Sequence, residues 1–302
     1  MSLVSIANTR WGPNAAKWLV RVLPRRFILW VADRIAGRVA RQKDTAMVAA
    51  LRSNQSVVQG LPEDDPKILE TVEAIIRNTI RSYVSLFDVM DGGHEALAKI
   101  AHPDKGLLEK IDEILAQDRG MLYVGAHTVG LDHLLIYMGG LDYPTQVLAY
   151  PEVLPSYQAQ NDLRRSFGMN LSPVSYRSLR EAITYLRNGG VVITAADRPD
   201  ESGAFLEFFG KRAWLPVGHA RLALKTNAPI MVGVTYITDG GRYRAKTLTV
   251  IEPEQFVGHA EPEKALAQAV IHELEGFIRD HPSEWWMFHR VWPDGNDELG
   301  ER

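Results

Sequence analysis

The sequence has no cysteine among its 302 residues. That absence excludes disulfides, thiolate metal ligands and a cysteine nucleophile. Long hydrophobic runs are absent as well. The apolar stretches near residues 134–138 and 229–234 are far shorter than the roughly 20 residues that cross a bilayer, so the sequence predicts no transmembrane helix.

Two further patterns are missing. The N-terminal apolar stretches are interrupted by Arg21, Arg25 and Arg26 and are followed by no small-residue cleavage site, as a secretory signal would require. We therefore expect the chain to remain on the cytoplasmic side. No G-x-S-x-G elbow is present, which argues against a serine hydrolase of the α/β type.

Charge is distributed unevenly along the chain. The overall net charge is −3, but residues 10–43 hold nine Lys or Arg and one acid, Asp33, so this segment carries +8 and the remainder −11. A basic segment on an acidic body indicates an anionic surface as partner. Nucleic acid is disfavoured, because phosphate would repel the acidic body.

The basic segment predicts two amphipathic helices, residues 14–23 and 25–42, separated by Pro24. Apolar and basic side chains take opposite sides of the second helix: Phe27, Val31, Ile35 and Val39 against Arg34, Arg38 and Arg41. Such a pair is typical of helices lying in a membrane interface, with cations near lipid phosphates. Packing against the protein's own core is the alternative.

After a predicted helix at residues 66–88, helical and strand patterns alternate. We expect helices at residues 107–117, 131–138, 157–167, 178–187, 218–225 and 263–280, and strands at 121–126, 146–150, 171–174, 191–196, 230–236 and 243–251. This predicts an α/β fold with a mainly parallel mixed sheet flanked by helices, the Asp-Gly-Gly turn at 239–241 adding an antiparallel strand. The domains would be residues 1–43 and 44–302.

Ionisable residues follow two of these strands: His127 comes after one, and Asp197 with Arg198 after another. Sites in open α/β sheets lie at the carboxyl ends of the strands, so one cleft is predicted. Asp132 lies five positions after His127, about 140° around a continuous helix, so His127 must lie in the turn. There Asp132 could accept a hydrogen bond from the ring and increase its basicity.

A metal site is the alternative for this stretch. The H-x-H-x-D-H pattern of metallo-hydrolases would need histidines at positions 128 and 130, which are Thr128 and Gly130 here. We therefore predict no metal and no cofactor.

The segment of residues 195–236 resembles a block of the bacterial lipid A biosynthesis acyltransferases, and most closely the phosphatidylinositol mannoside acyltransferases. It has Asp-Arg after a strand, then Phe208-Phe209-Gly210, then Pro-x-Gly before a small-residue helix and a buried strand. Upstream, His127 and Asp132 match the His-x4-Asp signature. The ending HPSEWWMFHRVWP is similar to that family's C-terminal segment.

The resemblance implies a glycerolipid-acyltransferase-like fold. It also implies acyl transfer from an acyl thioester, either acyl-CoA or acyl carrier protein, to a glycolipid or phospholipid hydroxyl. His127 would be the general base, oriented by Asp132. Substrate-binding roles would fall to Arg198, Asp197, Arg164, Phe208, Phe209 and Gly210. The enzyme would be peripheral on the cytoplasmic face of the membrane, with anionic lipid as partner.

Three alternatives stay open at this point. A lysophospholipid or glycerol-phosphate acyltransferase shares the His-x4-Asp motif but usually has a different substrate-binding motif. Water in place of the acceptor would make the protein a thioester hydrolase. A non-catalytic lipid-binding protein of the same fold would bind these substrates without turning them over.

Overall fold

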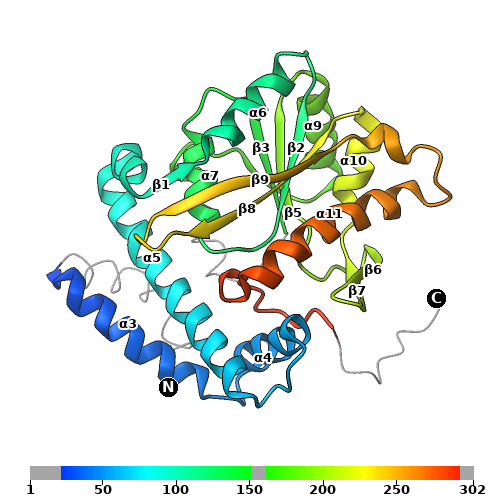
Figure 1. Ribbon diagram of the computed structural model, residues 1–302. Helices are drawn as coiled ribbons and strands as arrows, with labels where there is room; N and C mark the ends of the chain where they lie inside the picture. Colours follow the sequence, from blue (N-terminus) through cyan, green and yellow to red (C-terminus); the bar gives the residue numbers. More distant parts are fainter. Residues whose placement is uncertain (1–21, 151–160, 163, 293–302) are drawn as a thin grey trace.

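The computed structural model describes residues 22–150, 161–162 and 164–292. A seven-stranded sheet is its centre, in the order β1-β9-β8-β2-β5-β3-β4 (Figure 1). The strands are β1 (Ala101–Pro103), β2 (Met121–Gly125), β3 (Thr145–Ala149), β4 (Leu171–Pro173), β5 (Val191–Ala195), β8 (Ile230–Ile237) and β9 (Tyr243–Ile251). All neighbours pair in parallel except β8 and β9, which confirms the predicted mixed sheet.

Helices cover both faces of the sheet, because successive residues of a strand point to opposite sides. Leu122 and Val124 of β2 belong to the core shared with α9 (Tyr176–Arg187), α10 (Gly218–Thr226) and α11 (Pro262–Asp280). Met121 and Tyr123 belong to the core shared with α6 (Lys105–Leu115) and α7 (Leu131–Gly139). Every residue of β2 is buried, as expected for a central parallel strand.

A helical layer precedes the sheet: α3 (Arg25–Ala40), α4 (Ala46–Gln59) and α5 (Pro66–Ile100) share a third apolar core. The helix predicted at 66–88 begins where expected, with Pro66 at its first position and Asp65 capping it. It continues to Ile100, beyond the predicted end at residue 88, but Gly93 has φ 61° and ψ −152°, so the helix is kinked there.

Helix α4 was not predicted from the sequence. Its central Arg52, Ser53, Asn54 and Gln55 are polar and yet buried, which hides the usual apolar stripe. The β6–β7 hairpin (Ala204–Phe208 and Lys211–Leu215) and the short β1 were also unpredicted. The predicted helix 14–23 lies almost wholly outside the described residues, and helix 157–167 lies partly outside them. In the described part of the chain, no helix is long and apolar enough to span a bilayer.

Candidate active site

His127 and Asp197 follow the carboxyl ends of two neighbouring strands. Gly125 of β2 pairs in register with Ala195 of β5, so each of the two residues lies two positions beyond a paired residue. The backbone N–H of His127 donates to Asp197 Oδ2 at 2.8 Å. Ring Nδ1 lies 2.7 Å from Asp197 Oδ1. One carboxylate therefore fixes both the turn and the ring of His127.

The carboxylate of Asp197 is fully buried and accepts a third hydrogen bond, from the Trp285 indole Nε1 at 2.8 Å. Burial alone would raise the pKa of Asp197, but the charge and hydrogen bonds of His127, together with the indole N–H, lower it. An ionised Asp197 accepts a hydrogen bond from Nδ1–H. The ring proton therefore stays on Nδ1, and Nε2 is the basic nitrogen. The His127 side chain is 36% exposed, so a bound molecule can reach the ring.

The structure corrects the partner of the His127 ring. Asp132 was predicted to accept a hydrogen bond from this ring, whereas ring Nδ1 is bonded to Asp197. Asp132, in the first turn of α7, instead forms an ion pair with Arg164, whose Nε and Nη2 lie 2.6 and 2.5 Å from Oδ1. Sheet register explains the difference, since it sets residues 127 and 197 side by side. In the sequence, His127 and Asp197 each directly follow a predicted strand, and this shared position was the signal for the pair.

The two predicted substrate-binding arginines lie in different surroundings. Arg164 is mostly buried, its side chain 16% exposed, and it also donates to Asn161 at 2.9 Å. Arg198, next to Asp197, is half-buried and lies over the ring of Tyr150, 4.2 Å from its centre. Asp197, also predicted to bind substrate, has both carboxylate oxygens occupied by His127 and Trp285.

The Phe208-Phe209-Gly210 segment forms the tip of the β6–β7 hairpin. Phe209 (φ 53°) and Gly210 (φ 69°) join paired residues Phe208 and Lys211, the arrangement of a type I′ turn. Phe208 is fully buried, with its ring centre 5.8 Å from that of Trp285. This aromatic contact supports the residue that holds Asp197. Substrate binding by the three tip residues stays a prediction.

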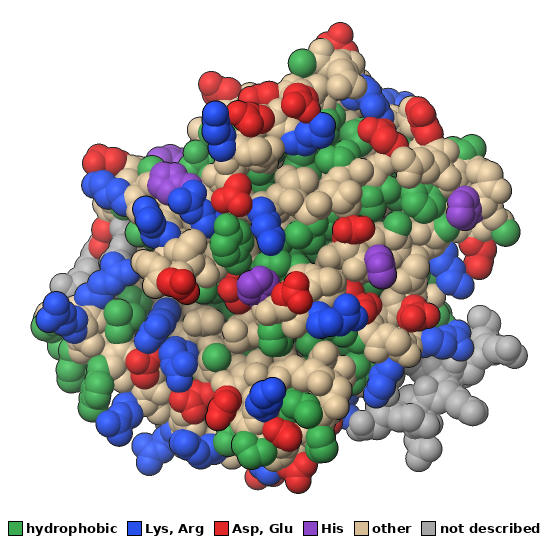
Figure 2. Space-filling view, in the orientation of Figure 1, with side chains coloured by type: hydrophobic (Ala, Val, Ile, Leu, Met, Phe, Trp, Pro, Cys, Tyr) green, Lys and Arg blue, Asp and Glu red, His purple; other side chains and the backbone are tan. Residues whose placement is uncertain are grey.

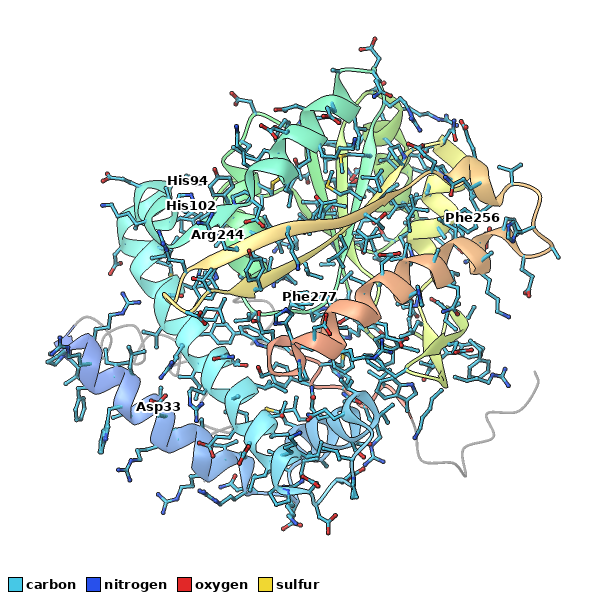
Figure 3. All side chains as sticks on the ribbon, viewed as in Figure 1. Asp33, His94, His102, Arg244, Phe256 and Phe277 are labelled. Atoms are coloured by element: carbon cyan, nitrogen blue, oxygen red, sulfur yellow. The ribbon has the colours of Figure 1, made fainter. Side chains whose placement is uncertain are left out.

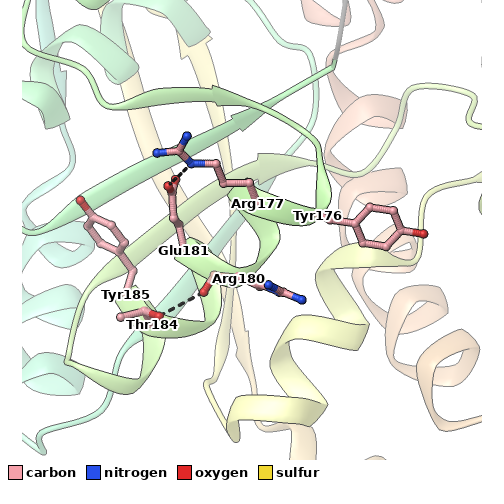
Figure 4. A pocket seen from close by; sticks show the side chains of 6 residues that line it. All are labelled: Tyr176, Arg177, Arg180, Glu181, Thr184 and Tyr185. Atoms are coloured by element: carbon pink, nitrogen blue, oxygen red, sulfur yellow. Dashed lines mark hydrogen bonds and ion pairs between the residues drawn. The ribbon is translucent and has the colours of Figure 1, made fainter.

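An open hollow of about 520 Å³ lies on helix α9. Its lining residues are Tyr176, Arg177, Arg180, Glu181, Thr184 and Tyr185 (Figure 4). Arg177 pairs with Glu181 at 3.2 Å, while Tyr176 projects away from the other five. Helix α9 follows β4, which is parallel to β3, so its N-terminus lies at the same sheet edge as His127. None of the lining residues was predicted from the sequence to be a binding residue.

Comparison with known proteins supports the resemblance inferred from sequence. The family model for bacterial lipid A biosynthesis acyltransferase matches residues 2–293. The chain is 26% identical to the phosphatidylinositol mannoside acyltransferase of Mycobacterium tuberculosis over 304 residues, covering 96% of this chain and 90% of the relative. It is also 26% identical to that of Mycolicibacterium smegmatis over 308 residues, covering 95% and 93%.

A solved structure, the 1-acyl-sn-glycerophosphate (LPA) acyltransferase of Thermotoga maritima, aligns with 84% of this chain and 98% of its own at 19% identity, with a TM-score of 0.38. The family match extends over nearly the whole chain and includes His127, Asp132 and Asp197. The chain thus belongs to the bacterial lipid A biosynthesis acyltransferase family and is an acyltransferase that acts on lipid substrates.

Proposed function

We propose that this acyltransferase moves a fatty acyl group from acyl-CoA or acyl carrier protein to a hydroxyl of a glycolipid or phospholipid. The observation that carries the proposal is the accessible His127 ring, held at Nδ1 by the buried carboxylate of Asp197. The relatives named phosphatidylinositol mannoside acyltransferase support a glycolipid acceptor.

In the proposed mechanism, His127 Nε2 takes the proton of the acceptor hydroxyl. The hydroxyl oxygen attacks the thioester carbonyl carbon and forms a tetrahedral intermediate. The C–S bond then breaks, and the thiolate that leaves takes the proton back from the imidazolium. Asp197 stabilises the imidazolium that forms between the two steps and fixes its tautomer. The products are an ester and a free thiol, and no cofactor takes part.

Asp132 and Arg164 have a separate role in this proposal. Their ion pair is largely buried, and a buried guanidinium oriented by one carboxylate can offer its remaining N–H groups to a phosphate. Arg164, together with Arg198, would bind the negative charge of the acceptor headgroup. Asp132 therefore acts on the acceptor through Arg164, and Asp197 acts on the base.

The donor's negative charges would bind at the N-terminal half of α9. Both acyl-CoA phosphates and the acidic surface of a carrier protein need cations, and Arg177 and Arg180 line the hollow there. No carboxylate among the described residues pairs with Arg180. The thioester would reach His127 along the shared edge of the sheet.

The protein would reach its lipid through α3. Phe27 and Trp30 on this helix are 47% and 54% exposed, with ring centres 5.9 Å apart. Arg34 lies over the Trp30 ring at 5.2 Å, and Arg38 is exposed one turn further along. Figure 2 shows Lys/Arg and hydrophobic side chains gathered over α3 at the lower left. Aromatic rings beside arginines are suited to the interface of an anionic membrane.

The acidic residue of α3 faces the neighbouring helix α5. Asp33 (labelled in Figure 3) pairs with Arg81 at 2.8 Å and Arg77 at 3.4 Å, both on α5. These pairs and the buried Ala36, Val39 and Ala40 fasten the helix to the layer below it. The outer face is therefore left with arginines and aromatic rings, as a peripheral membrane contact requires.

Incubation of the purified protein with labelled acyl-CoA tests the function. Acyl transfer that requires an added mannosylated phosphoinositide supports the glycolipid proposal, whereas transfer only to lysophospholipid or glycerol phosphate assigns the acceptor to glycerolipid synthesis. Thiol release unchanged by any acceptor identifies a thioester hydrolase. If neither transfer nor release occurs with acyl-CoA or acyl carrier protein, the proposed chemistry is wrong.

A further inference from the structure

We infer that Asn54, on helix α4, is a positioning residue for His127 and Asp197, acting through the C-terminal strap (residues 282–292). This inference rests on the proposed roles of those two residues. Asn54 precedes His127 by more than 70 positions in sequence and lies in a helix of the N-terminal layer. Hydrogen bonds connect Asn54 to the strap, and further hydrogen bonds connect the strap to His127 and Asp197.

The strap runs antiparallel beside the turn that carries His127. Thr128 and Trp285 form an isolated antiparallel bridge. The Trp286 N–H donates to the His127 carbonyl at 2.7 Å, and the Val129 N–H donates to the Glu284 carbonyl at 2.9 Å. From the centre of this bridge, the Trp285 side chain reaches Asp197. The strap thus contacts both members of the pair, one through backbone and the other through the indole.

Asn54 fixes the strap just beyond Trp285. Its amide Nδ2 donates to the carbonyls of Met287 at 3.0 Å and His289 at 2.8 Å. Its Oδ1 accepts the Val291 N–H at 3.0 Å. The side chain is 1% exposed, so water does not replace these bonds.

Only a side chain with two donors and one acceptor satisfies all three backbone groups at once, and a primary amide is such a group. A carboxylate at this position would face two carbonyl oxygens with no proton to give. The neighbouring Gln55 donates to the Pro282 carbonyl at 2.9 Å, so α4 holds the strap on both sides of Trp285. A strap fastened at both ends keeps the indole N–H aimed at Asp197.

The test compares Asn54→Asp with Val72→Ala. Val72 is a buried core residue on α5 in the same helical layer, and no hydrogen bond joins its side chain to the strap. The substrate-free readout is the Trp285 indole N–H signal in a ¹H–¹⁵N spectrum, assigned by its loss in Trp285→Phe. The second readout is the separation of kcat from KM for acyl-CoA, at a temperature where both variants are folded.

Asn54→Asp should shift the Trp285 indole signal and lower kcat on the order of tenfold to a hundredfold with little change in KM, because the reacting groups are misplaced. Val72→Ala should lower the melting temperature and leave both readouts near wild type. Should Asn54→Asp fail to fold, Asn54→Ala takes its place with the same expectation.

Two results would overturn the inference: an unmoved indole signal in the folded Asn54 variant, or the same signal shift and kcat loss in Val72→Ala. If wild type shows no acyl transfer, the proposed function fails but the indole signal still decides whether Asn54 positions Trp285. The two failures are therefore distinguishable.

Discussion

The Asp197 carboxylate accepts two hydrogen bonds from His127, one from the backbone N–H at 2.8 Å and one from ring Nδ1 at 2.7 Å. The two bonds fix the position of the residue and the plane of its ring together. Because Asp197 is fully buried, its charged form is stabilised by these two bonds and by the Trp285 indole N–H in place of water. This relationship, rather than the nearness of Asp132 in sequence, defines the proposed base.

Removing either member of the pair should abolish most activity. His127→Ala and Asp197→Asn are each expected to lower kcat by roughly 10²–10⁴, since general-base catalysis and control of the tautomer are lost. His127→Ala also removes the ring N–H that the buried Asp197 carboxylate accepts, so it should lower the melting temperature, and the kinetics are measured at a temperature where the variant is folded. Steady-state kinetics with acyl-CoA and acceptor measures the effect. A fully active His127→Ala would exclude the mechanism.

Asp132→Asn should affect the acceptor more than the base. Loss of its charge releases Arg164, whose Nε and Nη2 are both bound by Asp132. We expect KM for the anionic acceptor to rise about tenfold, since charge-assisted hydrogen bonds contribute roughly 1.5–3 kcal/mol each. Donor thiol release without acceptor should change less. If Asp132→Asn instead matches Asp197→Asn in kcat with acceptor KM unchanged, Asp132 acts on His127.

Charge reversal on α9 should weaken donor binding. The double variant Arg177→Glu and Arg180→Glu is expected to raise KM for acyl-CoA by about tenfold at low salt, with a smaller effect as salt screens the charges. The control is Arg187→Glu at the other end of the same helix, outside the lining of the hollow. An equal effect of the control on KM would mean that the overall charge, and not the hollow, matters.

Loss of the exposed rings on α3 should release the protein from membranes. Phe27→Ala and Trp30→Ala are each expected to weaken liposome binding by about tenfold, the order of effect that burying one large apolar side chain produces. Val257→Ala is the control, because Val257 is 71% exposed on another part of the surface. Flotation with and without anionic lipid gives the measurement. Binding that ignores lipid charge would contradict the role of Arg34 and Arg38.

Glu284 should make the protein less stable as pH rises. Burial raises the pKa of this carboxyl to about 7, against smaller lowering effects from the Ile237 N–H and Lys246. The folded state then binds more protons than the unfolded state between the ordinary pKa of 4.5 and pH 7, so folding stability falls across that range.

Glu284→Gln removes this dependence and still accepts the Ile237 N–H through its amide oxygen. We expect it to be more stable than wild type at pH 8, by up to about 3 kcal/mol, with most of the gain gone at pH 5. Urea unfolding at the two pH values tests this. A gain of equal size at both would show that the charge of Glu284 is not the cause.

Local sequence patterns were sufficient for most of the sheet. Residues 121–126 and 191–196 are apolar runs long enough for buried strands, and β2 and β5 lie within them. The Asp-Gly-Gly turn likewise indicated the antiparallel pairing of β8 with β9. Helix α4 was not predicted because its buried Asn54 and Gln55 bond partners more than 220 positions away, Met287 and Pro282.

Local periodicity and motifs predict the α/β fold, the family, and the strand-end positions of His127 and Asp197. The choice of the carboxylate that accepts the ring hydrogen bond could be read only from the folded chain. That choice depends on parallel register, which sets Gly125 opposite Ala195 and is fixed by the packing of the whole sheet. The pairing of Asp132 with Arg164, and the anchoring of the strap by Asn54, depend in the same way on contacts between distant segments.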